Sequence, residues 1–364
     1  MRILFHVPYP LNRLATGSSV HPFRMLEAFL AAGFDVFTIS GTTRERRKQI
    51  IQLSQSQLDR IAFCYSSPSS YPVHPVWDYL FYKKVNERRI PTGIFYCDAY
   101  WLLAPEWIRQ PPLRRWLLVQ RYRLDLLIFG HFARVMFFPS SSFAECFDIQ
   151  QRKAILYPGA MNLDRAILNA EHARAKSNIV IYVGSITPRY GLDILLEALE
   201  LANREIHVVL EMVCPDDQYL EYKTIINQYR NADWLRVSHH TANQLEYIYS
   251  QSKLGVVPLR RNLYNDLAMP VKLFEYYSYG LPVIVTNCTE MAQFVSNTGT
   301  GLIAEDNPES IAEKILLALH NDQLYLSLSQ AVLNTIKNGN LWKDRATAVA
   351  RALLDENLFD RQFQ

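Results

Sequence analysis

The alternation of apolar runs with amphipathic stretches predicts two parallel β-sheets covered by helices. Short apolar runs typical of buried strands occupy residues 2–7 and 92–96 in the first half, and residues 179–183 and 254–259 in the second. Between them, apolar residues recur at helical spacing. Strands separated by helices favour parallel sheets, because each crossover must return the chain to the same edge. We therefore predict an α/β protein with two doubly wound, Rossmann-like domains facing a cleft.

A change in composition near the middle of the chain predicts the domain boundary. Residues 162–177 are polar and helical and carry no strand pattern, as expected for a linker. We therefore predict an N-terminal domain of residues 1–160 and a C-terminal domain of residues 161–343. The last amphipathic stretch, residues 344–364, is expected to form a helix that packs back on the first domain.

Composition and charge exclude several classes of protein. The chain has 364 residues, 49% hydrophobic and 20% charged, which suits two globular domains that each bury a core. A net charge of +3 is too small to indicate nucleic acid, and the five cysteines have no metal-binding spacing. The apolar run at the start is too short for a signal peptide and is interrupted by Pro8 and Pro10. The most apolar region, residues 124–138, contains His131 and Arg134 and is too short to span a bilayer. We expect a cytoplasmic protein that is soluble or peripheral on the inner face of the cell membrane.

Residues 265–287 combine the features of a helix N-terminus that binds an anion. Pro270 suits the first helical position, where its missing N–H costs nothing, and Gly280 with Pro282 ends the helix about ten residues later. Apolar runs flank this helix on both sides. Its N-terminus is therefore expected at the carboxyl edge of a parallel sheet, where free N–H groups favour negative charge.

Two charged residues on this helix are candidates for ligand binding. Lys272 lies in the first turn, where a cation opposes the helix dipole unless an anion such as phosphate is also present. Glu275 lies one turn further on the same face, where a carboxylate can accept hydrogen bonds from a sugar diol. The alternative is an intrahelical Lys272–Glu275 pair on a solvated face.

The first half contains two weaker candidates. A loop at residues 8–19 contains Gly17 and precedes a helix, but it lacks GxGxxG and no acidic residue ends the next strand, which disfavours a dehydrogenase. Gly17 permits either a tight turn or a close approach of the backbone to a ligand. Asp98 follows the strand at residues 92–96, where it either contacts a ligand or caps the next helix.

Residues 109–134 form a basic and aromatic stretch. It carries Arg109, Arg114, Arg115, Arg121, Arg123 and Arg134 next to Trp107, Trp116 and Tyr122. This pattern at helical spacing suits the surface of an anionic membrane or a lipid-phosphate acceptor, and the alternative is an ordinary solvated helix.

Four motifs resemble the nucleotide-sugar glycosyltransferases of the GT-B fold, and within them glycosyltransferase family 4. They are LYPGAMN (156–162), YVGSITPRYGLDILLEAL (182–199), PVKLFEYYSYGLPVIVTN (270–287) and GTGLI (299–303). The resemblance implies transfer of a hexosyl unit from a UDP- or GDP-sugar to a glycan or lipid-linked acceptor, usually with retention and without an essential metal or other cofactor. Synthesis of a cell-envelope, capsule or exopolysaccharide fits such an enzyme.

The sequence departs from the family pattern in two places. The family commonly has a Glu-x7-Glu pair; Glu275 matches its second member, but Leu267 stands at the first, beside Asn265 and Asp266. In the loop after the first strand of the second domain, Ser185 and Tyr190 stand where the family often has Arg and Lys, which leaves Arg189 as the nearby cation.

The resemblance assigns provisional roles to these residues. The negative charge of the diphosphate rises as the sugar leaves. The groups expected to bind this diphosphate are Lys272, Arg189, the N–H groups of the Pro270 helix and the backbone at Gly17. Glu275 would hold the ribose, and Asp98 would orient the acceptor hydroxyl or the sugar. The expected donor-binding set is Gly17, Ser185, Asn265, Asp266, Met269, Pro270, Val271 and Glu275. Residues 213–216 and 239–241 are expected to surround the base.

Two rival functions fit the same fold. One is a nucleotide-sugar epimerase, which needs several acid–base side chains that the sequence does not cluster convincingly. The other is a non-catalytic GT-B subunit that binds a partner glycosyltransferase, an alternative that the two departures leave open.

Overall fold

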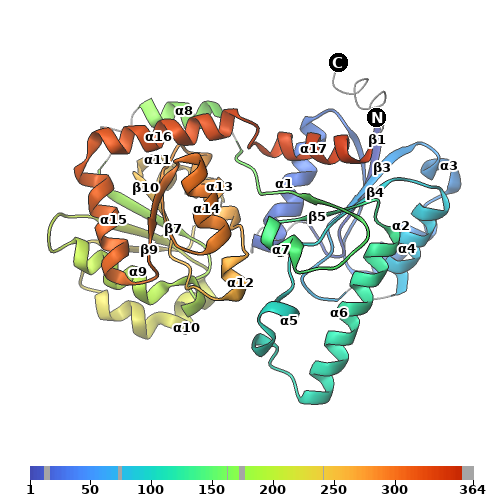
Figure 1. Ribbon diagram of the computed structural model, residues 1–364, viewed down its shortest axis with the longest axis horizontal. Helices are drawn as coiled ribbons and strands as arrows, with labels where there is room; N and C mark the ends of the chain where they lie inside the picture. Colours follow the sequence, from blue (N-terminus) through green and yellow to red (C-terminus); the bar gives the residue numbers. More distant parts are fainter. Residues whose placement is uncertain (12–16, 73–75, 162, 172–176, 241, 355–364) are drawn as a thin grey trace. The chain divides into compact units, whose positions relative to one another are not determined.

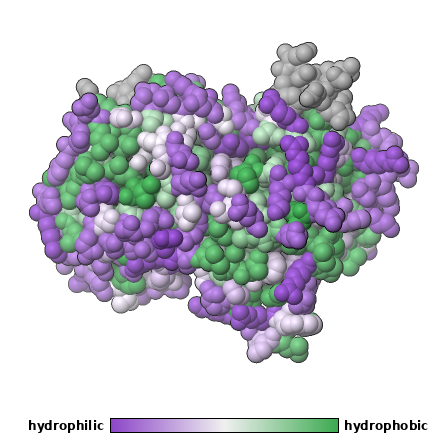
Figure 2. Space-filling model, viewed as in Figure 1, coloured by the Kyte–Doolittle hydropathy of each residue, from purple (hydrophilic) through white to green (hydrophobic). Residues whose placement is uncertain are grey.

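The computed structural model describes residues 1–11, 17–72, 76–161, 163–171, 177–240 and 242–354. The chain divides into two compact units. The first contains Met1–Pro158 together with the chain from Trp342 onward, and the second is Gly159–Leu341. Each unit has a six-stranded parallel sheet with helices packed around it (Figure 1). Hydrophilic residues cover much of the surface in the view of Figure 2.

The sheet of the first unit has the strand order β2-β1-β3-β4-β5-β6. The strands are β1 (Arg2–His6), β2 (Asp35–Ile39), β3 (Ile61–Ser66), β4 (Thr92–Phe95), β5 (Val135–Phe138) and β6 (Arg152–Ile155). The helices are α1 (Gly17–Ala31), α2 (Thr43–Gln52), α3 (Gln55–Leu58), α4 (Val76–Glu87), α5 (Tyr100–Leu103), α6 (Pro112–Phe132) and α7 (Ser141–Glu145), with a 3-10 turn at Pro105–Trp107. All residues of β4 and β5 are buried, which explains why these runs are almost entirely apolar.

The mostly polar stretch of residues 42–58 forms two helices. Thr42 caps α2 in a capping box with Glu45, and Ser54 starts α3 in a second capping box with Gln57. The extended backbone of Leu53 separates the two helices. A second cap inside the run therefore ends the first helix, because the Ser54 side chain offers the backbone a competing hydrogen bond.

A buried polar network holds helices α2 and α4 against the first sheet. His6 Nδ1 lies 2.9 Å from Ser66 Oγ, and His6 Nε2 lies 3.2 Å from Asp78 Oδ1. Arg46 donates to both oxygens of Asp78 at 2.8 and 2.7 Å. Burial opposes ionisation, yet hydrogen bonds from Arg46 and His6 hold the pKa of Asp78 below its usual value. Although Ser66, His6 and Asp78 are arranged like a catalytic triad, all three are fully buried, so the network is structural.

The last described helix, α17 (Trp342–Leu353), belongs to the first unit. Trp342 contacts the ring of His21 on α1 at a centroid distance of 5.2 Å, and Arg134 donates to the carbonyl oxygen of Leu353 at 3.2 Å. The helix begins two residues before the predicted start at position 344. Residues 355–364 of the prediction lie outside the described residues.

The sheet of the second unit has the strand order β12-β11-β10-β7-β8-β9. The strands are β7 (Ile179–Val183), β8 (Val209–Val213), β9 (Leu235–Ser238), β10 (Leu254–Val257), β11 (Val283–Thr286) and β12 (Gly301–Ala304). The helices are α8 (Leu163–Glu171), α9 (Leu192–Ala202), α10 (Asp216–Ile226), α11 (Ala242–Gln251), α12 (Leu263–Asp266), α13 (Val271–Tyr277), α14 (Thr289–Thr298), α15 (Pro308–His320) and α16 (Asp322–Lys337). Within the described part of this unit, short 3-10 turns occupy Pro188–Tyr190 and Asn227–Tyr229.

The second sheet ends at the edge strand β12. Its residues 301–303 belong to the GTGLI motif, and the strand pairs with β11 in parallel. Helix α16 was not predicted, although its buried face includes Leu328, Val332 and Ile336 at helical spacing. Both features lie in the predicted C-terminal domain and extend the same doubly wound architecture.

Candidate active site

Helix α13 connects β10 to β11 in the second unit, so its N-terminus lies at the carboxyl edge of the sheet. Pro270 is the residue before the helix rather than its first residue, and it has an extended backbone conformation. The chain leaves the helix at Gly280, whose N–H donates to the carbonyl oxygen of Tyr277 at 2.8 Å. Proline and glycine therefore bound this short helix, as the sequence indicates.

Lys272 is the most unusual residue of this edge. Its Nζ is buried and has no hydrogen-bond partner among the residues that the structure describes. The nitrogen lies 4.0 Å from the centroid of the Tyr182 ring and 5.4 Å from that of Tyr190. Burial lowers the pKa of Lys272 to about 7, against the opposing charge of Glu275. The two ring faces replace only part of the solvation that this buried ammonium loses.

The loop after β7 leaves room for this ammonium. Gly184 has φ +122°, and a Cβ atom added there would lie 3.2 Å from Lys272 Nζ. Gln218 of α10 holds the loop, because its Oε1 accepts hydrogen bonds from Ser185 Oγ at 2.8 Å and from the N–H of Ile186 at 2.9 Å. Nothing in the sequence distinguishes Gln218 from other polar helix residues, so sequence reasoning missed it.

Arg189 lies beside Lys272 on a shared aromatic ring. Its guanidinium carbon is 4.6 Å from the Tyr190 ring centroid, and its Nη2 donates to the Tyr190 hydroxyl at 2.7 Å. The two cations expected to share a phosphate therefore both contact Tyr190. This tyrosine stands where the family often has lysine, and here it positions two cations instead of supplying one.

The three candidates before Pro270 are largely occupied by protein contacts. Asn265 is buried, and its Nδ2 donates to the carbonyl oxygens of Arg189 at 3.2 Å and Arg260 at 2.7 Å. Asp266 forms an ion pair with Arg261 at 3.1 Å. Met269 is buried. These contacts fix the loop that leads into α13, and they account for Asn265 and Asp266 without a ligand.

Glu275 and Val271 are partly buried on α13. Since Lys272 Nζ is buried and makes no hydrogen bond within the described chain, the alternative of a solvated Lys272–Glu275 pair is wrong. The charge of Glu275 adds to burial in raising the pKa of Tyr249.

In the expected base-binding region, His239 contacts several neighbouring residues. His239 Nδ1 lies 2.9 Å from the carbonyl oxygen of Cys214, and its Nε2 lies 3.6 Å from Asp216. The ring of Tyr219 is 5.1 Å from the His239 ring. Thr241, at the end of the predicted region, lies outside the described residues.

The candidates of the first half lie in the first unit. Gly17 is the first residue of α1 rather than part of the preceding loop, and residues 12–16 of that loop lie outside the described residues. Asp98 Oδ1 accepts the N–H of Tyr100, the first residue of α5, at 3.1 Å, although the N-cap of that helix is Ala99.

Part of the predicted basic and aromatic surface is not at the surface. Tyr122 is buried and donates to the carbonyl oxygen of Ser70, so it belongs to the core rather than to a surface. Arg134 follows α6 and bonds to α17, as described above. No helix in the described part of the chain is both long enough and apolar enough to cross a membrane.

Two doubly wound units place this chain in the class of α/β proteins with parallel sheets, and at the carboxyl edge of the second sheet Lys272 Nζ lacks a hydrogen-bond partner among the described residues. Residues 164–335 match the family of glycosyl transferases group 1. The chain is similar to this family over those residues, and its two units with parallel six-stranded sheets form a GT-B-like fold, which confirms the α/β fold class of two doubly wound domains predicted from the sequence.

Several known proteins are similar to this chain in sequence or in fold. Over 147 residues the chain is 24% identical to the O-antigen chain mannosyltransferase B of Escherichia coli, which covers 39% of this chain and 37% of the relative. The chain thus spans less than half the length of the curated relatives it matches. Among solved structures, sucrose-phosphate synthase from Thermosynechococcus elongatus has a TM-score of 0.67 at 14% identity, covering 99% of this chain and 100% of that one. Anabaena HepE in complex with UDP has a TM-score of 0.64 at 14% identity, covering 97% and 99%.

Proposed function

We propose that the protein transfers a hexosyl unit from a UDP- or GDP-sugar to a glycan or lipid-linked acceptor. The observation that carries this proposal is the buried ammonium of Lys272, which lacks a hydrogen-bond partner in the described chain. A diphosphate supplies the charge that such a group needs. The names of similar proteins, a mannosyltransferase and a protein crystallised with UDP, support a nucleotide-sugar donor.

In the proposed reaction, the bond between the anomeric carbon and the phosphate oxygen breaks while the acceptor oxygen bonds to that carbon. The negative charge of the diphosphate rises at this point, so Lys272 and Arg189 stabilise the transition state more than the ground state. The leaving phosphate oxygen accepts the proton of the acceptor hydroxyl, which allows retention without a side-chain base. Glu275 holds the ribose hydroxyls, while the roles of Gly17 and Asp98 stay predictions from the sequence.

The proposed setting is synthesis of a cell-envelope, capsule or exopolysaccharide, at the inner face of the cell membrane. The relative that adds mannose to an O-antigen chain supports this class of acceptor. Nucleotide sugars and lipid-linked intermediates meet at that face, and the basic helix α6 suits it.

A non-catalytic subunit is the second candidate, because Ser185 replaces a family arginine and Asp266 is engaged by Arg261. Release of UDP or GDP from a panel of nucleotide sugars distinguishes the two. We expect release by the wild type and a loss of about 10- to 100-fold in Lys272→Met, since a hydrogen bond to a charged group contributes roughly 1.5–3 kcal/mol. Lys223→Met, at an exposed lysine of α10, is the matched control. Donor binding without release would favour the non-catalytic subunit.

A further inference from the structure

Helix α6 presents a second apolar face to solvent. Five large apolar side chains project from it: Leu113 (70% exposed), Trp116 (57%), Leu117 (49%), Leu124 (50%) and Leu127 (73%). At about 100° of rotation per residue, these positions fall within an arc of about 100°. We call this arc the leucine stripe. Figure 2 shows hydrophobic residues at the surface in the region of α5 and α6.

The core of the first unit does not use the leucine stripe. The buried residues Tyr122, Asp125 and Phe129 lie on the opposite side of the helix, at roughly 120–180° from the centre of the stripe. Tyr122 and Asp125 hydrogen-bond there to the Tyr100 and Tyr79 hydroxyls. The stripe is therefore not a misplaced core face, because the helix already packs through its other side.

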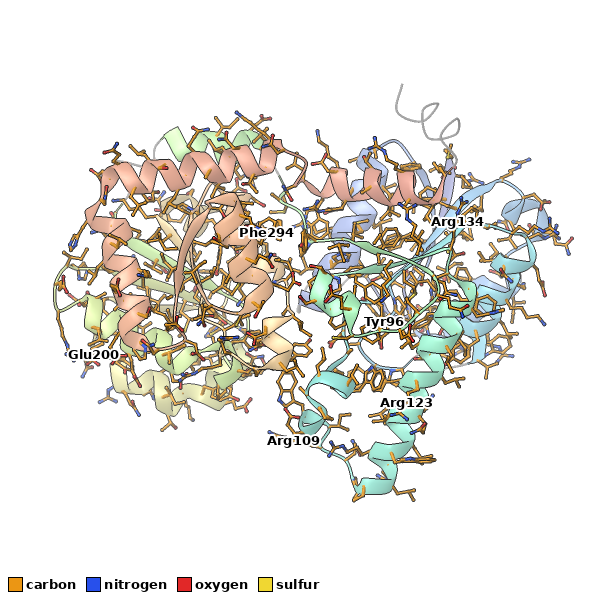
Figure 3. The ribbon with its side chains drawn as sticks, viewed as in Figure 1. Tyr96, Arg109, Arg123, Arg134, Glu200 and Phe294 are labelled. Atoms are coloured by element: carbon orange, nitrogen blue, oxygen red, sulfur yellow. The ribbon has the colours of Figure 1, made fainter. Side chains whose placement is uncertain are left out.

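Arginines border the leucine stripe on both sides. Arg114 and Arg121 lie roughly 90° to one side of its centre, and Arg123 lies roughly 90° to the other. All three are exposed, and none forms an ion pair with a residue that the structure describes. Figure 3 labels Arg109 and Arg123 along this part of the unit, with Arg134 close to the sheet. Between residues 109 and 134 there are six arginines and one carboxylate, Asp125, in a chain whose net charge is only +3.

We propose that the leucine stripe rests on an anionic lipid bilayer, with α6 lying in the plane of the membrane surface. The leucines and Trp116 would enter the boundary between headgroups and acyl chains, and the bordering arginines would contact lipid phosphates. The same face suits a second copy of this chain poorly, because pairing two stripes brings their arginines together. This inference specifies the surface for the membrane location that the proposed function includes, and it does not depend on the donor chemistry.

The test measures partition of the full chain onto vesicles of phosphatidylcholine with and without 30% phosphatidylglycerol. We expect binding to the anionic vesicles that weakens as salt is raised, since screening acts on the arginine contacts. A triple variant should lower the partition coefficient at least tenfold; it combines Leu117→Ser, Leu124→Ser and Leu127→Ser. The matched control, Leu30→Ser with Leu220→Ser, removes side chains that are 54% and 56% exposed elsewhere and should bind like the wild type.

A second variant tests the charge. Changing Arg114, Arg121 and Arg123 to Gln should lower binding to anionic vesicles about 100-fold, because each cation near the surface contributes roughly fivefold. The exposed arginines Arg204 and Arg230, changed to Gln, serve as the control.

Three results would overturn the inference. They are equal binding to neutral and anionic vesicles, a leucine variant that binds like its control, and a dimer in solution that the leucine variant dissociates. Urea unfolding and nucleotide release without vesicles verify that each variant is folded. If the wild type binds vesicles but releases no nucleotide from any donor, the proposed function fails and the membrane surface stands.

Discussion

The buried Lys272 predicts that the affinity for a nucleoside diphosphate depends on pH. In the free protein, burial lowers the pKa of Lys272 from 10.5 to about 7. That shift corresponds to roughly 5 kcal/mol of lost ammonium solvation. A bound diphosphate favours the charged form and raises the pKa again. Between these two pKa values, binding therefore takes up one proton.

The expected magnitude follows from this linkage. Below pH 7 Lys272 is already charged, and its contribution to affinity is constant. Above pH 7 the dissociation constant should rise about tenfold per pH unit, reaching about 100-fold at pH 9. The nucleotide's own phosphate titration adds a pH dependence that is the same in every variant.

Isothermal titration calorimetry of UDP and GDP between pH 6 and 9 measures this effect. The informative quantity is the ratio of the dissociation constants of Lys272→Met and the wild type, because the phosphate titration cancels in it. We expect that ratio to be large below pH 7 and to approach one as the pH rises. Lys223→Met should follow the wild type across the whole range.

Folding stability of the free protein provides an independent measurement of the same pKa. Between pH 7 and 10.5 the unfolded chain holds a proton on Lys272 that the folded chain has released, so this lysine makes stability rise with pH by up to about 1.4 kcal/mol per unit. Urea unfolding of Lys272→Met should lack that rise. A wild-type affinity profile parallel to that of Lys272→Met would refute the reasoning.

Three further outcomes are expected. Glu275→Ala should lower donor turnover at least tenfold if the carboxylate holds the ribose, because losing a bond to a charged group costs roughly 1.5–3 kcal/mol, and an unchanged rate would remove that role. Asp78→Asn should lower the free energy of unfolding, measured with urea, by about 3–5 kcal/mol, because it leaves buried Arg46 without its carboxylate. The affinity for UDP should stay the same. A change in unfolding free energy below about 1 kcal/mol would contradict the structural role. Gly191→Ala should lower the free energy of unfolding by more than about 2 kcal/mol, because φ at this residue is +75° and the new Cβ would lie 1.8 Å from the Pro258 carbonyl oxygen. A variant as stable as the wild type would show that the turn relaxes.

The sequence by itself determined the architecture of the chain. Alternating strand and helix patterns indicate two parallel sheets, because burial on both faces requires apolar strands and each crossover requires a helix. The bounds of one strand also follow from the pattern: strand β7 (Ile179–Val183) coincides with the apolar run predicted there. Lys272 was also a candidate from its place in the first turn of a helix between two strands.

Only the tertiary structure decided what surrounds each candidate. The Tyr182 and Tyr190 rings enclose the Lys272 ammonium, which turns an ordinary surface cation into a buried one with a lowered pKa. Asn265 holds a loop in place, since its Nδ2 donates to the carbonyl oxygen of Arg189, 76 residues away in sequence. The sequence did not reveal the leucine stripe of α6 either, because exposure depends on tertiary packing. Periodicity shows that a helix has apolar positions, but which of them face the core depends on the elements packed against it.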